Sequence, residues 1–146
     1  MRRLCVLALL LTLNPLTDNV YSYNLKQISD KEYMTNSSIT SLCQDGRGLM
    51  WIGTCDGLNV YDGQRVFEYR ISDGPDYLSG NLIDNMVNSS GRICWIQTYY
   101  GLNRLDMDTG EIVHFNQFQK LFFMTSDRDE NFFVLNDSNC VYHYDE

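Results

Sequence analysis

The chain has 146 residues, a length typical of one domain, and a globular composition with two prolines and 13% aromatic residues. Its formal net charge at pH 7 is −8. An acidic surface of this kind repels phosphate backbones, which argues against nucleic-acid binding. Solubility is the simplest explanation of the acidity.

Residues 1–22 have the pattern of a secretory signal peptide. Arg2 and Arg3 precede an apolar run over residues 4–13, and Ser22 offers a small residue at a cleavage point. The run is short for a bilayer span, so an uncleaved anchor is the lesser alternative. Cleavage leaves 9 basic and 18 acidic side chains, a net charge of −9. The pattern predicts export.

Residues 23–38 form a polar lead-in to a first unit over residues 39–82. Short apolar or alternating runs predict four strands in this unit, over residues 39–44, 49–52, 58–62 and 65–70. Cys55, Asp56 and Gly57 are expected to form a three-residue hairpin loop with glycine last. The glycine- and proline-containing segment 72–76 then ends the unit.

A second unit covers residues 83–120 and repeats the first at a spacing of 44 residues. Its predicted strands cover residues 83–87, 93–98, 102–106 and 111–115. Eight positions are identical in one register, which establishes an internal repeat. The identical pairs are Ile39 and Ile83, Trp51 and Trp95, Ile52 and Ile96, Thr54 and Thr98, Gly57 and Gly101, Leu58 and Leu102, Asn59 and Asn103, and Asp62 and Asp106.

Residues 121–146 contain a degenerate or partial third copy. Residues 127–136 keep an acidic turn and an aromatic strand, and residues 141–145 supply an alternating partner. Four short antiparallel strands per repeat are typical of a propeller blade, with Trp51 and Trp95 as packing residues between blades. We therefore expect an all-β fold, a partial β-propeller of two to three four-stranded blades. Closed propellers need about four to eight blades, so this chain is expected not to close alone.

The cysteines and histidines show no arrangement for metal binding or catalysis. Cys43, Cys55, Cys94 and Cys140 lie outside the signal peptide, at positions that the repeat does not match. Buried free thiols are the default expectation, and a disulfide is an open alternative. His114 and His143 lack metal-ligand spacing, and a structural role is expected for His114. The sequence predicts no catalytic residue, metal or cofactor.

The segment from residue 25 to 115 resembles the two-component regulator propeller repeats found in hybrid two-component histidine kinases of Bacteroidetes. Its departures from the pattern are Ser89, where the family has an acidic residue, and Gln97, where it has glycine. The resemblance is carried by Asp45-Gly46-Arg47-Gly48, Trp51-Ile52-Gly53-Thr54, Gly57-Leu58-Asn59, Trp95-Ile96 and Gly101-Leu102-Asn103-Arg104.

The resemblance implies a periplasmic, non-enzymatic sensor module that detects oligosaccharides derived from glycans. The parent protein would lie in the inner membrane, and this module would act together with the remaining blades and the kinase core of that protein. Whether the module forms a homodimer is left open. Sugar recognition favours aromatic faces beside polar groups, so Tyr99, Tyr100 and Arg104 are the candidate ligand-binding residues. The alternative is that the two tyrosines only decorate a loop.

The sequence also leaves two other interpretations open. In the first, the chain is a truncated, non-functional reading frame or an interaction module. In the other it is an enzyme on a propeller scaffold, such as a streptogramin lyase, which requires a histidine-based acid–base centre on a closed ring.

Overall fold

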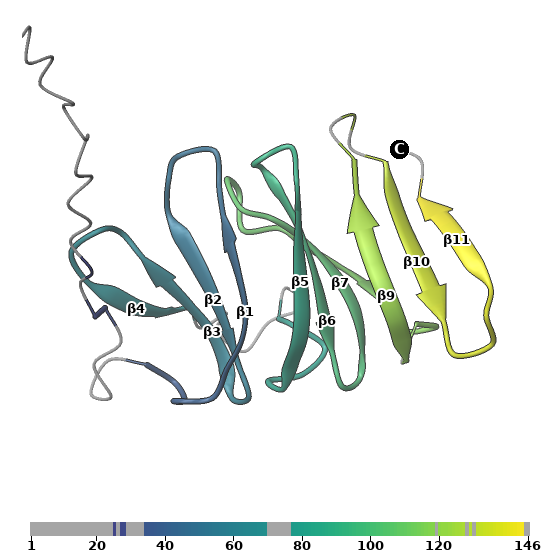
Figure 1. Cartoon of the computed structure of the whole chain (residues 1–146), viewed down its shortest axis with the longest axis horizontal. Helices are drawn as coiled ribbons and strands as arrows, with labels where there is room; N and C mark the ends of the chain where they lie inside the picture. Colours follow the sequence, from purple (N-terminus) through teal and green to yellow (C-terminus); the bar gives the residue numbers. More distant parts are fainter. Residues whose placement is uncertain are drawn as a thin grey trace, which may run out of the picture.

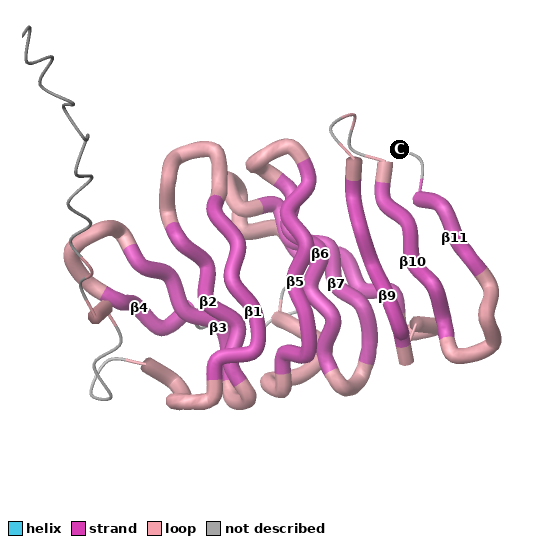
Figure 2. Tube along the Cα trace, viewed as in Figure 1, coloured by secondary structure: helices cyan, strands magenta, loops and turns pink. Residues whose placement is uncertain are grey.

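The computed structural model describes residues 25, 27, 28, 34–69, 77–118, 120–127, 129 and 131–144. The predicted signal peptide at 1–22 and the predicted break at 72–76 lie outside these residues, as does most of the lead-in. Across the described ranges the secondary structure is entirely strands and turns, as Figure 2 shows. None of these residues forms a helix with the length and hydrophobicity that crossing a bilayer requires.

The strands form three antiparallel sheets that follow one another along the chain (Figure 1). The first sheet has the order β1 (Ile39–Gln44), β2 (Met50–Thr54), β3 (Gly57–Tyr61) and β4 (Val66–Tyr69). The second has the order β5 (Ile83–Ser89), β6 (Ile93–Thr98), β7 (Gly101–Asp106) and β8 (Ile112–Phe115). The third joins β9 (Leu121–Ser126), β10 (Phe132–Asn136) and β11 (Val141–Tyr144), with β10 in the middle.

The three sheets lie face to face like blades, with β1 against β5 and β5 against β9 (Figure 1). They do not close into a ring. The predicted all-β fold, a partial propeller of two to three blades, is confirmed. Two of the sheets have four strands as expected, and the third has three.

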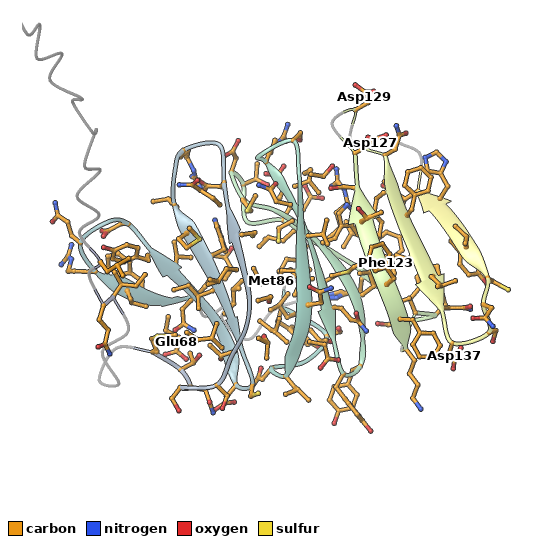
Figure 3. The ribbon with its side chains drawn as sticks, viewed as in Figure 1. Glu68, Met86, Phe123, Asp127, Asp129 and Asp137 are labelled. Atoms are coloured by element: carbon orange, nitrogen blue, oxygen red, sulfur yellow. The ribbon has the colours of Figure 1, made fainter. Side chains whose placement is uncertain are left out.

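One hydrophobic core, called here the first core, fills the space between the first and second sheets. Successive strand residues point to opposite faces, so each sheet offers one face to each neighbour. Trp51 contributes the largest side chain from the first sheet and packs edge-on against Tyr69, with ring centroids 5.0 Å apart. Met86 enters from the second sheet (Figure 3). The other fully or mostly buried members are Leu58, Val60, Ile83, Cys94, Ile96, Leu105, Met107 and Ile112.

A second core lies between the second and third sheets and is centred on Trp95. The Trp95 indole stacks on the Phe132 ring, with centroids 3.9 Å apart and planes 3° from parallel. Phe115 and Tyr144 pack around the same indole. The two tryptophans of the repeat thus occupy equivalent positions in successive cores. Burying side chains of this size is worth roughly 1.5–3 kcal/mol each.

The β2–β3 hairpin differs from the sequence expectation. The predicted three-residue loop is wrong, because Gly57 already belongs to β3 and pairs with Thr54, which leaves only Cys55 and Asp56 in the loop. Gly57 has a φ of 127°. Gly57 thus has the left-handed backbone conformation that the sequence predicted, but as the first residue of β3 and not as the last residue of the loop.

Candidate ligand-binding face

A repeated polar network fastens the segment before each sheet to the end of a hairpin. In the first repeat the Asn59 amide donates to Thr35 Oγ1 at 2.8 Å and accepts from the Thr35 backbone N–H at 3.1 Å. The Thr35 and Thr54 hydroxyls lie 2.9 Å apart, and the Thr54 hydroxyl donates to the Gly57 carbonyl. Buried amides and hydroxyls are stabilised by such complete pairing. This network explains why Thr54, Gly57 and Asn59 are repeated.

The second repeat builds the same network from Ser79, Thr98 and Asn103. The Asn103 amide donates to Ser79 Oγ at 2.9 Å, and the Ser79 and Thr98 hydroxyls lie 2.7 Å apart. Thr98 donates to the carbonyl of Gly101, as Thr54 does to Gly57. In addition, His114 Nδ1 lies 2.8 Å from Asn103 Oδ1. His114 therefore contributes to a structural network.

Tyr99 and Tyr100 form the loop of the β6–β7 hairpin, directly above this network. Their side chains are 60% and 62% exposed and meet edge to face, with centroids 5.1 Å apart. The backbone is fixed by hydrogen bonds from Tyr99 N–H to the Leu82 carbonyl and from Tyr100 N–H to Thr98 Oγ1. Tyr100 also lies against Gly80, where an added Cβ would stand 2.7 Å from its ring. The pair is thus two exposed rings on an ordered turn.

Arg104 lies elsewhere on the same hairpin. It stands opposite Trp95 in the β6–β7 pairing, on the face of the second sheet that turns toward the third. It is three residues from Gly101 along β7, which is about 10 Å of extended chain. The structure therefore brings the two tyrosines together at the hairpin end and places Arg104 further along the strand.

Aspartates at the other turns hold backbone N–H groups. Asp45 Oδ1 accepts from the N–H groups of Arg47 and Leu49, and Oδ2 accepts from the Trp51 indole at 3.2 Å and from the Arg47 guanidinium at 2.9 Å. Burial would raise the pKa of Asp45, but these hydrogen bonds outweigh it and the pKa is lowered. Arg47 then donates to the Met107 carbonyl at 2.7 Å, which links the first sheet to the second.

Asp106 does the same at the β7–β8 turn. The Arg92 guanidinium, 2.6 Å away, is the main cause that lowers the pKa of Asp106 to about 2. The Asp106 carboxylate also accepts from the N–H groups of Asp108 and Thr109. Both carboxylates are engaged by the turn N–H groups and by an arginine, and these contacts account for their lowered pKa values. Among the described residues, no group of three or more His, Cys, Asp or Glu side chains is arranged to hold a metal ion.

Sequence reasoning missed the networks of Asn59, Asn103 and Asp45, although their signal was present. Asn59 and Asn103 are identical across the repeat, and Asp45 begins the turn of the first copy. The partners Thr35 and Ser79 also lie 44 residues apart, but one is threonine and the other serine. A search for identical residues overlooks this pair, whereas a comparison that treats serine and threonine as equivalent would find it.

The family model described as the two component regulator propeller matches residues 33–56. No curated protein gives a significant match. The matched residues contain β1, β2 and the Asp45 turn, and the match confirms the resemblance to two-component regulator propeller repeats.

Solved structures of two extracellular domains from B. thetaiotaomicron have the same fold. One, described as that of the hybrid two component system BT3049, is 20% identical and has a TM-score of 0.61, with 82% of this chain and 20% of that chain covered. The other, from the hybrid two component system BT4673, is 23% identical with a TM-score of 0.60, covering 84% and 19%. The chain spans about a fifth of the length of these structures.

An enzyme shares the fold as well. The structure of virginiamycin B lyase from Staphylococcus aureus is 12% identical, with a TM-score of 0.53 and coverage of 77% of this chain and 43% of that one. At such identities the likeness shows the propeller fold alone, which hosts unrelated functions.

Proposed function

We propose that this chain is the ligand-binding propeller part of an exported two-component sensor, and that it detects oligosaccharides derived from glycans. The family-model match supports the sensor class, and the two sensor extracellular domains are compatible with it. In this proposal residues 1–22 direct export to the periplasm of a parent protein anchored in the inner membrane. The remaining blades and a kinase core are its partners, with dimerisation of the parent as a further option.

The observation that carries ligand binding is the exposed pair Tyr99 and Tyr100. The equivalent turn of the first repeat has Cys55 and Asp56, and the Asp56 N–H bonds to Thr54 just as the Tyr100 N–H bonds to Thr98. The same backbone geometry is thus reached without aromatic rings, so the hairpin does not need them. Rigid aromatic rings with polar tips at an ordered surface suit recognition of a sugar face.

The proposal assigns no catalytic role to the chain. His114, the histidine nearest the tyrosine pair in sequence, is engaged with Asn103, and its ring lies 6.0 Å from that of Tyr77. A histidine serving a structural amide in this way is poorly placed as a general base. Any phosphotransfer would belong to the kinase core of the parent protein.

Calorimetric titration of the full-length parent with glycan-derived oligosaccharides tests the proposal. Tyr99→Ala and Tyr100→Ala are each expected to weaken binding about tenfold or more, the loss typical of an aromatic anchor. Arg104→Ala tests separately whether the guanidinium contributes.

The matched controls are Cys55→Ala and Asp56→Ala, at the equivalent turn of the first repeat. They are expected to leave the affinity unchanged. Equal affinity of the parent and both tyrosine variants would remove the tyrosine pair from the site, and absence of binding to every oligosaccharide class would overturn the ligand assignment.

A further inference from the structure

Two cysteines from different sheets meet in the first core. Cys43 lies on β1 and Cys94 on β6, and their sulfur atoms are 3.6 Å apart. The two residues are 51 positions apart in the sequence. A disulfide bond is about 2.05 Å long, so the sulfurs need to approach by about 1.5 Å. Closing this gap requires the two side chains to rotate toward each other.

The backbones around this pair are fastened to each other. The Asn88 amide donates to the Gln44 carbonyl, and Asn88 is the residue opposite Cys94 in the β5–β6 pairing. The Gly46 N–H donates to the Gly91 carbonyl at 2.6 Å. Figure 1 shows β1 and β5 running side by side at this interface. The neighbouring hydrogen bonds therefore hold the two thiols within reach of each other.

The two thiols differ in access and in acidity. Cys94 is fully buried, whereas Cys43 is only partly buried. Hydrogen bonding from the Cys94 thiol lowers the pKa of Cys43, although burial and the Asp45 charge oppose this. The same contact, with burial, raises the pKa of Cys94. Cys43 is thus the thiol that a reagent can reach and the one that more readily forms a thiolate.

We propose that Cys43 and Cys94 are a disulfide-forming pair that links the first and second sheets covalently under oxidising conditions. The oxidant is a low-molecular-weight disulfide. The Cys43 thiolate attacks one of its sulfurs, a mixed disulfide forms, and one thiolate leaves. Cys94 then loses its proton and attacks the Cys43 sulfur, which expels the second thiolate. In total, two protein thiols are oxidised and one disulfide is reduced to two thiols. The reaction does not involve the oligosaccharide ligand proposed above.

Mass spectrometry of the full chain after incubation with oxidised glutathione tests this pairing. Trypsin places the four cysteines beyond residue 22 on separate peptides, covering residues 32–47, 48–65, 93–104 and 129–146, and Cys5 on the peptide 4–26. The expected product joins 32–47 to 93–104. The exposed thiols of Cys55 and Cys140 serve as internal controls, since glutathione adducts there show that the oxidant was active.

The melting temperature provides a second readout. A disulfide formed by chance in unfolded chains would not raise it. In a Cys5→Ser, Cys55→Ser, Cys140→Ser background, oxidation is expected to raise the melting temperature by roughly 10 °C, because the bond closes a loop of about 50 residues. Adding Cys43→Ala to that background should abolish the shift. Free thiols at both Cys43 and Cys94 after oxidation, or glutathione adducts on Cys43 without the joined peptide, would overturn the proposal.

Discussion

Asp45 and Ser89 occupy the same position of the repeat but have opposite hydrogen-bonding states. Asp45 is buried and accepts from Arg47, Leu49 and Trp51. The buried Ser89 hydroxyl has no hydrogen-bond partner among the described residues. A buried polar group without a partner costs free energy, whereas a satisfied one stabilises the fold. The departure of Ser89 from the repeat pattern thus has a physical consequence.

Alanine substitution at these two positions should therefore act in opposite directions. Asp45→Ala is expected to lower the free energy of unfolding by about 2–4 kcal/mol, because it leaves the Trp51 indole and two N–H groups unpaired. Ser89→Ala is expected to change it little or to raise it by up to about 1 kcal/mol. Urea unfolding monitored by tryptophan fluorescence measures both. Similar losses in the two variants would show that Ser89 has a partner after all.

At the scale of elements, the turns before β2 and β6 determine how the first two sheets approach. Gly91 has a φ of 81°, and a Cβ added there would lie 3.2 Å from the backbone N and Cα of Gly46. The two turns thus touch backbone to backbone, which only glycine permits at this distance. Gly63, in the β3–β4 turn, has a similar φ of 95° but nothing within 4 Å of an added Cβ.

Gly91→Ala is consequently expected to destabilise more than Gly63→Ala. Both substitutions incur a left-handed strain of about 1–2 kcal/mol. Only Gly91→Ala also forces the turns of neighbouring sheets apart, adding a cost of about 1 kcal/mol or more. Chemical denaturation of the two variants gives the difference directly. An equal loss at both positions would mean that the Gly46–Gly91 contact contributes nothing to stability.

At the scale of the whole molecule, each sheet is stabilised by its neighbours in the stack. Within the described part of the chain, the second sheet has a core on both faces, whereas the third sheet has one, formed where Phe132 stacks on Trp95. Phe123, on β9 and 61% exposed, lies outside that core (Figure 3). In stacked repeats, stability is approximately a sum of repeat and interface terms. A substitution in the second core should therefore destabilise the third sheet without destabilising the first sheet to the same extent.

Phe132→Ala tests this expectation by hydrogen exchange. Loss of the stacked ring should speed amide exchange in β9, β10 and β11 by tenfold or more, while β1, β2 and β3 stay protected. The matched control is Phe133→Ala at the adjacent residue, which points to the opposite face and stacks on His143 at 4.6 Å. A uniform increase across all three sheets would instead indicate a single cooperative unit.

Much of the fold was predictable because its signals are local. Alternating apolar residues, turn glycines and the repeat of 44 residues predicted the strands and the blade class, since strand pairing across tight turns depends on residues close in sequence. The same local signals predicted that Tyr99 and Tyr100 lie in a hairpin loop. Buried thiols were predicted throughout, and this is wrong for Cys55 and Cys140, which lie in exposed turns.

Local periodicity and comparison of the copies were enough to assign the type of each element and the equivalence of Trp51 and Trp95. The contacts across the faces of neighbouring sheets became visible only in the three-dimensional packing. It placed Cys43 beside Cys94 and separated Arg104 from the tyrosine pair. The physical reason is that contacts between stacked sheets depend on twist and relative position, which join residues dozens of positions apart and leave no periodic signal in the chain.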